Sequence, residues 1–294
     1  MSNSLYKLHD WINLDKLNWH WLSRNPVAIQ LLERNPDKIV WNMLSRNPEA
    51  INLLTQNQHK IDWSVVSENP GLIKLLGQNP DKINWIKLSS NSGAVRLLQQ
   101  NPDKINWTGL SENPGAIHLL EQKPNKIDWS MLSRNPNAIH LLEQNQDKID
   151  WKQLSMNSSA INLLTQNQDK IDWDLISQNS NAVSLLEQNF DKISWTWLSS
   201  NPNATHLLEK NPNHINWTWL SANPQAIHLL KQSPDKLMYS FLSMNPNIFT
   251  VDYKILTQKI FNTGVAEGIL MERFHPKNMG KFVHWGYDEF KIDE

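Results

Sequence analysis

The sequence predicts an all-α protein, a right-handed α-solenoid built from 22-residue modules of two short α or 3-10 helices, with a cap at each end. The first observation behind this prediction is a strict period without insertions. One aromatic residue marks each period: Trp19, Trp41, Trp63, Trp85, Trp107, Trp129, Trp151, Trp173, Trp195, Trp217 and Tyr239. Such a period indicates one small unit stacked on copies of itself, and we expect the stack to be elongated.

The second observation is helical spacing inside each period. Asn25 is a typical N-cap residue, and Pro26 suits the first helical position because its nitrogen carries no proton to pair. Apolar residues within 28–32 then fall on one helix face. This longer helix should end at Asn35 and Pro36, because the residue before a proline avoids the helical region.

A second, shorter helix is expected at each tryptophan. Trp41 and Leu44 lie three residues apart and therefore share one helix face. A residue of the Asp or Asn type precedes most of the tryptophans and can cap this helix. Helices of one or two turns are not stable alone in water, so neighbouring modules must bury each other's apolar faces.

Two polar positions never vary. Serine occupies all eleven positions equivalent to Ser23, and asparagine all eleven equivalent to Asn25. We interpret them as capping and turn groups that serve the module, and the tryptophans as filling between layers. A polar stripe that binds a ligand is the alternative interpretation. The structural ladder so predicted comprises Trp41, Trp63, Trp85, Trp107, Trp129, Trp151, Trp173, Trp195 and Trp217, with Asn47, Asn69, Asn113 and Asn135.

Candidate binding residues lie where the modules differ. The residue two positions after each tryptophan varies, and its last four members, Leu175, Trp197, Trp219 and Phe241, are large and apolar. We predict that they form a ridge that binds a protein or peptide partner, because contiguous apolar surface and tryptophan are typical of binding sites. The alternative is that these side chains tuck into the stack.

A variable position inside the longer helix is a second candidate. His206 and His228 occupy it in adjacent modules, and we assign them to the partner-binding surface. His118 and His140 form a similar pair. Layers about 10 Å apart are too distant for two imidazoles to share one zinc ion, whose bonds to nitrogen measure about 2 Å. We therefore expect no metal site and no cofactor.

Charge and motif content bear on the remaining functional classes. Lys and Arg total 28 against 29 Asp and Glu, which argues against a nucleic-acid binder. A lysine column from Lys38 onwards alternates with aspartates, which is typical of a solvated edge. There is no cysteine, no Gly-rich phosphate loop and no nucleophile–base set, so we predict no catalytic residue and no enzyme. We find no signal peptide and no long apolar run, and expect an intracellular protein without a membrane partner.

Three segments follow from the pattern. Residues 1–18 carry a degraded copy of the repeat and are predicted to cap the first module. Residues 19–246 hold about ten full repeats, and residues 247–294 are predicted to supply capping helices and a charged tail. Caps are expected because the end modules of a solenoid otherwise expose an apolar face.

The repeat resembles a known family. The phrases W-T-W-L-S-S-N-P-N-A (195–204), A-I-H-L-L-E-Q-N (138–145) and N-P-D-K-I-N-W (101–107) are similar to a repeat found in uncharacterised proteins of giant DNA viruses, mimivirus relatives above all. The resemblance covers residues 13–246, and the tail at 274–288 is also similar. It implies a viral origin and a place in the host cytoplasm or the virion, and it supplies no catalytic residue.

These observations favour a non-enzymatic scaffold for protein–protein interaction, present as a monomer or weak homodimer. A passive structural or virion-associated component is the alternative. A nucleic-acid binder fits the charge balance less well.

Overall fold

The computed structural model describes residues 5–262, which divide into two compact units. The larger unit, His9–Ile248, contains the repeats, and we call it the ring unit. The smaller, which we call the terminal unit, joins Met1–Leu8 to Phe249–Glu294. Only residues 5–8 and 249–262 of the terminal unit are described.

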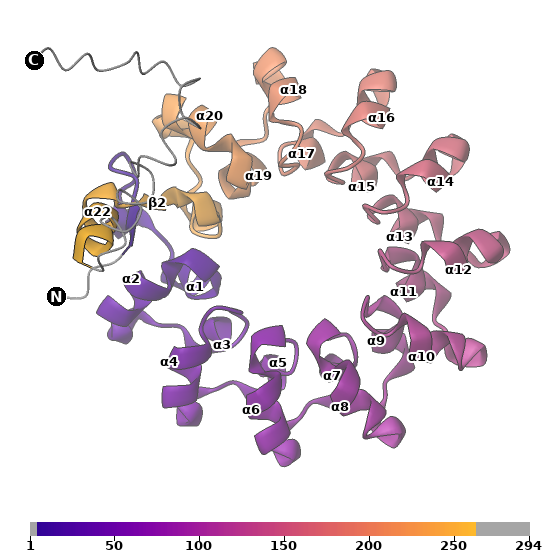
Figure 1. Cartoon of the computed structure of the whole chain (residues 1–294). Helices are drawn as coiled ribbons and strands as arrows, with labels where there is room; N and C mark the ends of the chain where they lie inside the picture. Colours follow the sequence, from indigo (N-terminus) through magenta and orange to yellow (C-terminus); the bar gives the residue numbers. More distant parts are fainter. Residues whose placement is uncertain (1–4, 263–294) are drawn as a thin grey trace, which may run out of the picture. The chain divides into compact units, whose positions relative to one another are not determined.

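Each module of the ring unit but the last places one helix on an inner circle and the next on an outer circle (Figure 1). We number the modules 1 to 11 from Trp19 to Tyr239. The inner helices are α1 (Trp19–Arg24), α3 (Trp41–Leu44), α5 (Trp63–Val66), α7 (Trp85–Ser89), α9 (Trp107–Glu112), α11 (Trp129–Arg134), α13 (Trp151–Ser155), α15 (Trp173–Ser177), α17 (Trp195–Leu198), α19 (Trp217–Ala222) and α21 (Tyr239–Leu242). The outer helices are α2 (Ile29–Arg34), α4 (Ile51–Gln56), α6 (Ile73–Gln78), α8 (Val95–Gln99), α10 (Ile117–Glu121), α12 (Ile139–Gln144), α14 (Ile161–Gln166), α16 (Val183–Gln188), α18 (Thr205–Lys210) and α20 (Ile227–Gln232). The predicted all-α repeat architecture is confirmed.

Short 3-10 turns connect the helices. One precedes each inner helix, at Leu14–Lys16, Pro36–Lys38, Gln58–Lys60, Pro80–Lys82, Pro102–Lys104, Pro124–Lys126, Gln146–Lys148, Gln168–Lys170, Phe190–Lys192, Pro212–His214 and Pro234–Lys236. Others follow inner helices, at Pro26–Ala28, Pro70–Leu72, Ser92–Ala94, Pro224–Ala226 and Pro246–Ile248. In modules 1, 3, 4 and 10, the longer helix that the sequence predicts is therefore a 3-10 turn followed by an α-helix. Asn35 and Pro36, which were expected to end this helix, begin a further 3-10 turn at Pro36–Lys38.

The core of each module is aliphatic. Leu44 on the inner helix and Leu54 on the outer helix are fully buried, as is Ala50 between them. The predicted ladder tryptophans are only half-buried, so the expectation that they are sealed between layers is wrong. In several modules a cation lies over the tryptophan ring instead. The Lys60 ammonium lies 4.6 Å from the ring centre of Trp41, 19 residues earlier, and similar contacts recur in several modules.

Invariant serines link consecutive modules. The Ser45 hydroxyl donates to the Trp41 carbonyl at 2.8 Å, inside its own inner helix. Its oxygen also accepts a hydrogen bond from the Asp62 amide of the next module at 3.1 Å. Serine is thus needed at this position because one small hydroxyl satisfies two backbone groups in different modules.

Invariant asparagines link modules in a second way. The Asn47 side-chain oxygen accepts from the Glu49 amide at 3.0 Å, a bond of the expected kind that here holds a turn, because helix α4 starts only at Ile51. Its side-chain nitrogen donates to the carbonyls of Ser23 and Asn25 in the preceding module, at 3.1 and 2.9 Å. Among the described residues, no buried side-chain nitrogen or oxygen lacks a partner.

The ring unit closes on itself. The side-chain nitrogen of Asn25 in module 1 donates to the carbonyls of Ser243 and Asn245 in module 11, at 3.1 and 3.0 Å. The Asn18 amide donates to the Ser243 hydroxyl at 2.8 Å. These are the same bonds that join consecutive modules elsewhere. The expectation that the stack is elongated is therefore wrong, because the two end modules pack on each other in a ring (Figure 1).

The terminal unit pairs the segment that precedes the ring unit in the sequence with the segment that follows it. Strand β1 (Tyr6–Leu8) is antiparallel to β2 (Phe249–Val251), with Lys7 opposite Thr250. Helix α22 (Tyr253–Asn262) follows. The predicted capping helices and charged tail beyond residue 262 lie outside the described residues. Across residues 5–262, every helix is too short or too polar to cross a bilayer.

Candidate partner-binding site

The predicted ridge lies on the inner helices of modules 8 to 11. We call Leu175, Trp197, Trp219 and Phe241 the aromatic arc. The ring centres of Trp197 and Trp219 are 5.2 Å apart, with planes tilted by 38°. Those of Trp219 and Phe241 are 5.4 Å apart in an edge-on arrangement at 74°. Consecutive modules therefore bring three aromatic side chains into one continuous row, as the 22-residue spacing predicts.

Each member of the aromatic arc is half-buried. One part of each ring contacts its neighbour, and another part is open to solvent. At the same position in modules 2 and 3, Met43 and Val65 are 7% and 6% exposed and belong to the core. The arc thus differs from Met43 and Val65 in offering large apolar side chains that the stack does not fully cover, a property that Trp21 of module 1 shares.

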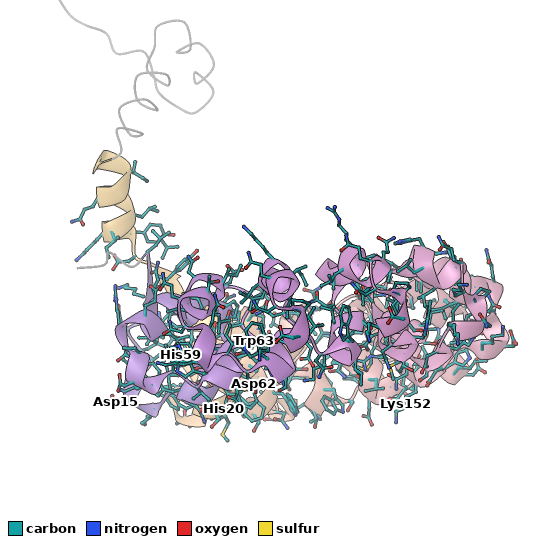
Figure 2. The ribbon with its side chains drawn as sticks, turned by 90° about the horizontal axis from the view of Figure 1, so that it is seen from below. Asp15, His20, His59, Asp62, Trp63 and Lys152 are labelled. Atoms are coloured by element: carbon teal, nitrogen blue, oxygen red, sulfur yellow. The ribbon has the colours of Figure 1, made fainter. Side chains whose placement is uncertain are left out.

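The three rings of the aromatic arc lie on uncharged helices, whereas helix α15, which carries Leu175, also carries Asp174. The inner helices that carry its three rings, α17, α19 and α21, contain no charged residue between them. In helix α13, by contrast, Lys152 follows directly after the tryptophan, and Figure 2 places it at the same edge of the ring as His20 of helix α1. Polarity on the inner helices therefore changes around the ring.

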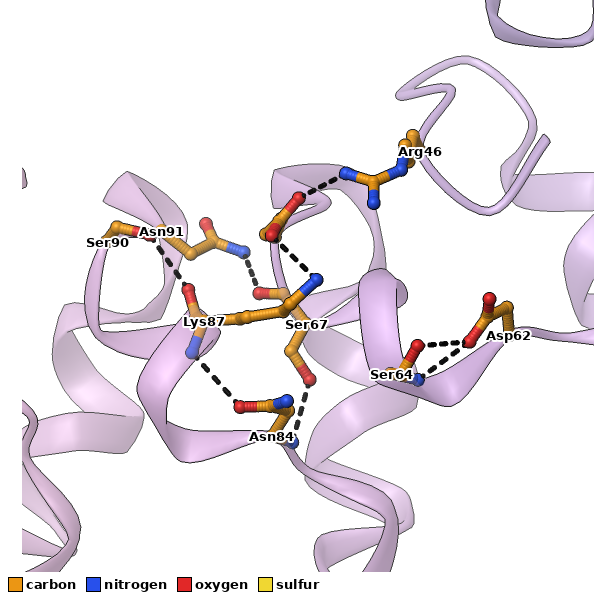
Figure 3. A network of polar contacts seen from close by, with 9 residues as sticks. Arg46, Asp62, Ser64, Ser67, Asn84, Lys87, Ser90 and Asn91 are labelled. Carbon is orange, nitrogen blue, oxygen red and sulfur yellow. Dashed lines mark hydrogen bonds and ion pairs between the residues drawn. The ribbon is translucent and has the colours of Figure 1, made fainter. Parts of the chain in front are cut away.

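Modules 2 to 4 carry charge on the inner helices and the turns after them (Figure 3). Lys87 occupies the position equivalent to Trp197, and its ammonium lies 3.0 Å from a carboxylate oxygen of Glu68. The other carboxylate oxygen of Glu68 lies 2.7 Å from the Arg46 guanidinium. Because these charges are partly exposed and paired, they add little stability but make this part of the surface polar.

The predicted histidines lie elsewhere. His206 and His228 are on the outer helices α18 and α20, whereas the aromatic arc is on the inner circle. The imidazole of His206 contacts Glu187 at 3.0 Å, and that of His228 contacts Glu209. The structure therefore does not join the two histidines to the arc in one site. Each is paired with a glutamate of the preceding outer helix.

The cation–aromatic contacts are a feature that the sequence argument missed. The lysine column was interpreted as a solvated edge, but Lys170 lies 4.4 Å from the ring centre of Trp151. His214 replaces lysine in one module and stacks on Trp195 at 4.7 Å. The constant 19-residue separation between each aromatic residue and the following cation was the available signal.

A further exposed aromatic side chain lies beside this stack. Phe190, 48% exposed, replaces the Pro, Gln or Leu found at its equivalents and contacts Trp195 edge-on at 5.3 Å. It was not among the predicted site residues. It stands out in the sequence only as the one aromatic residue in that column.

A sequence profile of a known family matches most of the modules. The profile of the periplasmic copper-binding protein NosD matches residues 78–265. This stretch is more than half of the sequence, so the chain belongs to that family. No curated protein and no solved structure matches the chain.

The described residues do not fit a copper ion. Within residues 5–262, histidine, aspartate and glutamate side chains nowhere gather in a group of three or more that could hold a metal. Cysteine is absent from the sequence. Pairs such as His140 with Glu121, 3.0 Å apart, provide two donors that are already bonded to each other. Copper prefers imidazole and sulfur ligands that converge on one point.

Proposed function

We propose that the ring unit is a non-enzymatic scaffold that binds a protein partner through the aromatic arc. The observation that carries this proposal is the row of half-buried rings formed by Trp197, Trp219 and Phe241. Tryptophan and other aromatic residues contribute a large share of the free energy at protein interfaces when a partner covers them. A row that spans three modules suits an extended or helical segment better than a small molecule.

The chemistry of the arc specifies the kind of partner. The helices that carry its three rings are uncharged, and they differ in this respect from the region of Arg46, Glu68 and Lys87. We infer that the partner is an uncharged peptide segment with apolar side chains in a row. Burial of apolar surface would then supply the affinity, and added salt would change it little.

Selection of displayed peptides that bind the full-length protein tests this function. Random peptides of about twelve residues would be selected on the immobilised wild type, and their Kd measured by fluorescence anisotropy. We expect apolar, uncharged binders whose Kd stays within about twofold between low and high salt. Replacing Trp197, Trp219 and Phe241 together with serine should weaken them at least about tenfold, since each lost ring contributes roughly 1 kcal/mol or more.

A matched variant distinguishes the arc from general damage. Lys87→Ser, Met131→Ser and Gln153→Ser change the same position in modules 4, 6 and 7, and the selected peptides should bind this variant as they bind the wild type. Circular dichroism checks that both triple variants stay helical. Equal binding to wild type and to the arc variant would show that the rings serve only to hold the modules together.

A further inference from the structure

We propose that the junction between module 11 and module 1 can open, and that the two faces exposed there dock head to tail with a second copy of this chain. We call this junction the seam. This inference concerns self-association and does not depend on what the aromatic arc binds.

The seam has complementary sides. Module 1 provides donors, the side-chain nitrogen of Asn25 and the amide of Asn18. Module 11 provides acceptors, the carbonyls of Ser243 and Asn245 and the Ser243 hydroxyl. Because one side donates and the other accepts, the interface joins two unlike faces. An interface of this kind can equally be formed between two different molecules.

A contact between a cation of module 1 and an aromatic ring of module 11 also joins two unlike faces. The Lys16 ammonium lies 5.4 Å from the ring centre of Tyr239, as Lys38 lies 4.8 Å from that of Trp19. The seam thus repeats three kinds of contact found at internal junctions: the bond to the serine hydroxyl, the asparagine side-chain bonds and the cation over an aromatic ring. Nothing in its chemistry restricts it to partners within one chain.

Opening would uncover groups that need partners. Asn25 is 2% exposed, and Ser243 and Asn245 are fully buried. In the open seam these groups bind water, and exchanging those bonds for protein–protein bonds gives a modest net gain, so an open seam tends to close or to find an equivalent face. At low protein concentration the chain's own face wins, because its effective concentration is about millimolar or higher. At high concentration a second copy competes.

The seam is also the junction most free to open. Every other pair of neighbouring modules is joined by a peptide bond, whereas modules 11 and 1 are joined only by non-covalent contacts. The β1–β2 ladder adds three residue pairs between the segment that leads into module 1 and the segment that follows module 11. A ladder this short is only marginally stable by itself.

The experiment uses single cysteines, which is straightforward because the chain has none of its own. Leu8 lies opposite Phe249 in the ladder. The next pair along, His9 and Ile248, is hydrogen-bonded at 3.0 Å, so by alternation Leu8 and Phe249 form a non-hydrogen-bonded pair. The α-carbons of such a pair are about 4.5 Å apart, within the range that a disulfide bridges.

One full-length variant carries Leu8→Cys and another carries Phe249→Cys. The two are mixed at about 100 µM, warmed to just below the unfolding midpoint, cooled, oxidised, and resolved on a non-reducing gel. We expect a disulfide-linked dimer containing one chain of each kind, at least about fivefold more abundant than in either variant alone. At about 1 µM the dimer should disappear, because intramolecular closure dominates.

Two controls decide the interpretation. The chain with both cysteines should form an internal disulfide at low concentration, which reports the closed ring. Adding Asn25→Ala to the mixture should accelerate dimer formation several-fold, whereas Asn135→Ala at an internal junction should not. Equal dimer in all mixtures, no mixed dimer after warming, or failure of the internal disulfide would each overturn the proposal.

Discussion

At the scale of single residues, the invariant asparagine does more than cap a helix. In module 5, the Asn113 side-chain oxygen accepts from the Gly115 amide at 2.9 Å. Its nitrogen donates to the carbonyls of Ser89 and Asn91, both at 2.9 Å. Only an uncharged amide offers an acceptor and two donors in so small a side chain. This requirement explains why neither Asp nor Ser ever replaces it.

Replacing Asn113 with alanine should lower the free energy of unfolding by about 2–4 kcal/mol, because two buried carbonyls lose their donor and the following turn loses its bond to the side-chain oxygen. Asn113→Asp keeps the bond to the turn but should destabilise at least as much, since it buries a charge among carbonyl oxygens. Asn137, whose exposed side chain donates only to the Pro114 carbonyl at 2.9 Å, is the matched control. Urea denaturation compares the variants, and equal losses at both positions would contradict this account.

The lysine that covers a tryptophan should contribute to stability as well. Lys170 lies 4.4 Å from the ring centre of Trp151 and ends a 3-10 turn. We expect Lys170→Gln to cost about 0.5–1 kcal/mol, the usual range for an exposed cation–aromatic contact. Lys126 ends the equivalent turn in another module, and among the described residues no ring lies under its ammonium. Lys126→Gln should therefore be nearly neutral in the same thermal unfolding measurement.

At the scale of elements, most of what forms a module could be predicted from the sequence. Asn25 and Pro26 start the segment that leads into the outer helix, and Trp41 starts an inner helix, as their local chemistry indicates. The 3-10 turn at Pro36–Lys38 was not predicted, because a three-residue turn has no periodicity to detect. Element type was predictable here since it depends on neighbours in the sequence.

Glycine positions give a prediction at the same scale. Gly77 lies on the exposed side of outer helix α6, and an added β-carbon would meet nothing within 4 Å. Gly77→Ala should therefore stabilise the protein by about 0.5–1 kcal/mol, the helix-propensity difference. At Gly71 the same atom would come within 2.8 Å of the Pro48 carbonyl oxygen, so Gly71→Ala should destabilise. The two unfolding midpoints should move in opposite directions, and a shared direction would refute the packing argument.

At the scale of the whole ring unit, closure was not predicted, and the reason is geometric. A small rotation at each junction sets the curvature of a repeat protein, and eleven modules close a circle at about 33° each. No residue pattern reports that angle directly. A clue was nevertheless present in the sequence. Residues 13–18 hold the end of the repeat and 239–246 hold its beginning, so the fragment interpreted as a degraded cap leads into module 1 and meets module 11 across the seam.

The location of the candidate site was partly predictable for the same reason. The 22-residue spacing placed Trp197, Trp219 and Phe241 in one row, and their contacts follow from it. His206 and His228 were grouped with that row although they belong to the other circle of helices. Sequence spacing orders residues within one column. It does not say which columns lie on the same side of a ring.

A ring joined by ten covalent junctions and one seam should open unevenly, and hydrogen exchange can measure this. The Asn18 amide donates to the Ser243 hydroxyl across the seam at 2.8 Å. The Asp150 amide makes the equivalent bond to Ser133 inside the chain at 3.1 Å. The static bond lengths alone would predict similar or better protection for Asn18. Opening at the seam requires only non-covalent contacts to break, so we expect the protection factor of Asn18 to be at least about tenfold lower.

An oxidised Leu8→Cys and Phe249→Cys bridge should remove most of that difference by holding together the segments on either side of the seam, while leaving the protection of Asp150 unchanged. Equal protection of the two amides in the unbridged protein would mean that the ring opens with no preferred junction.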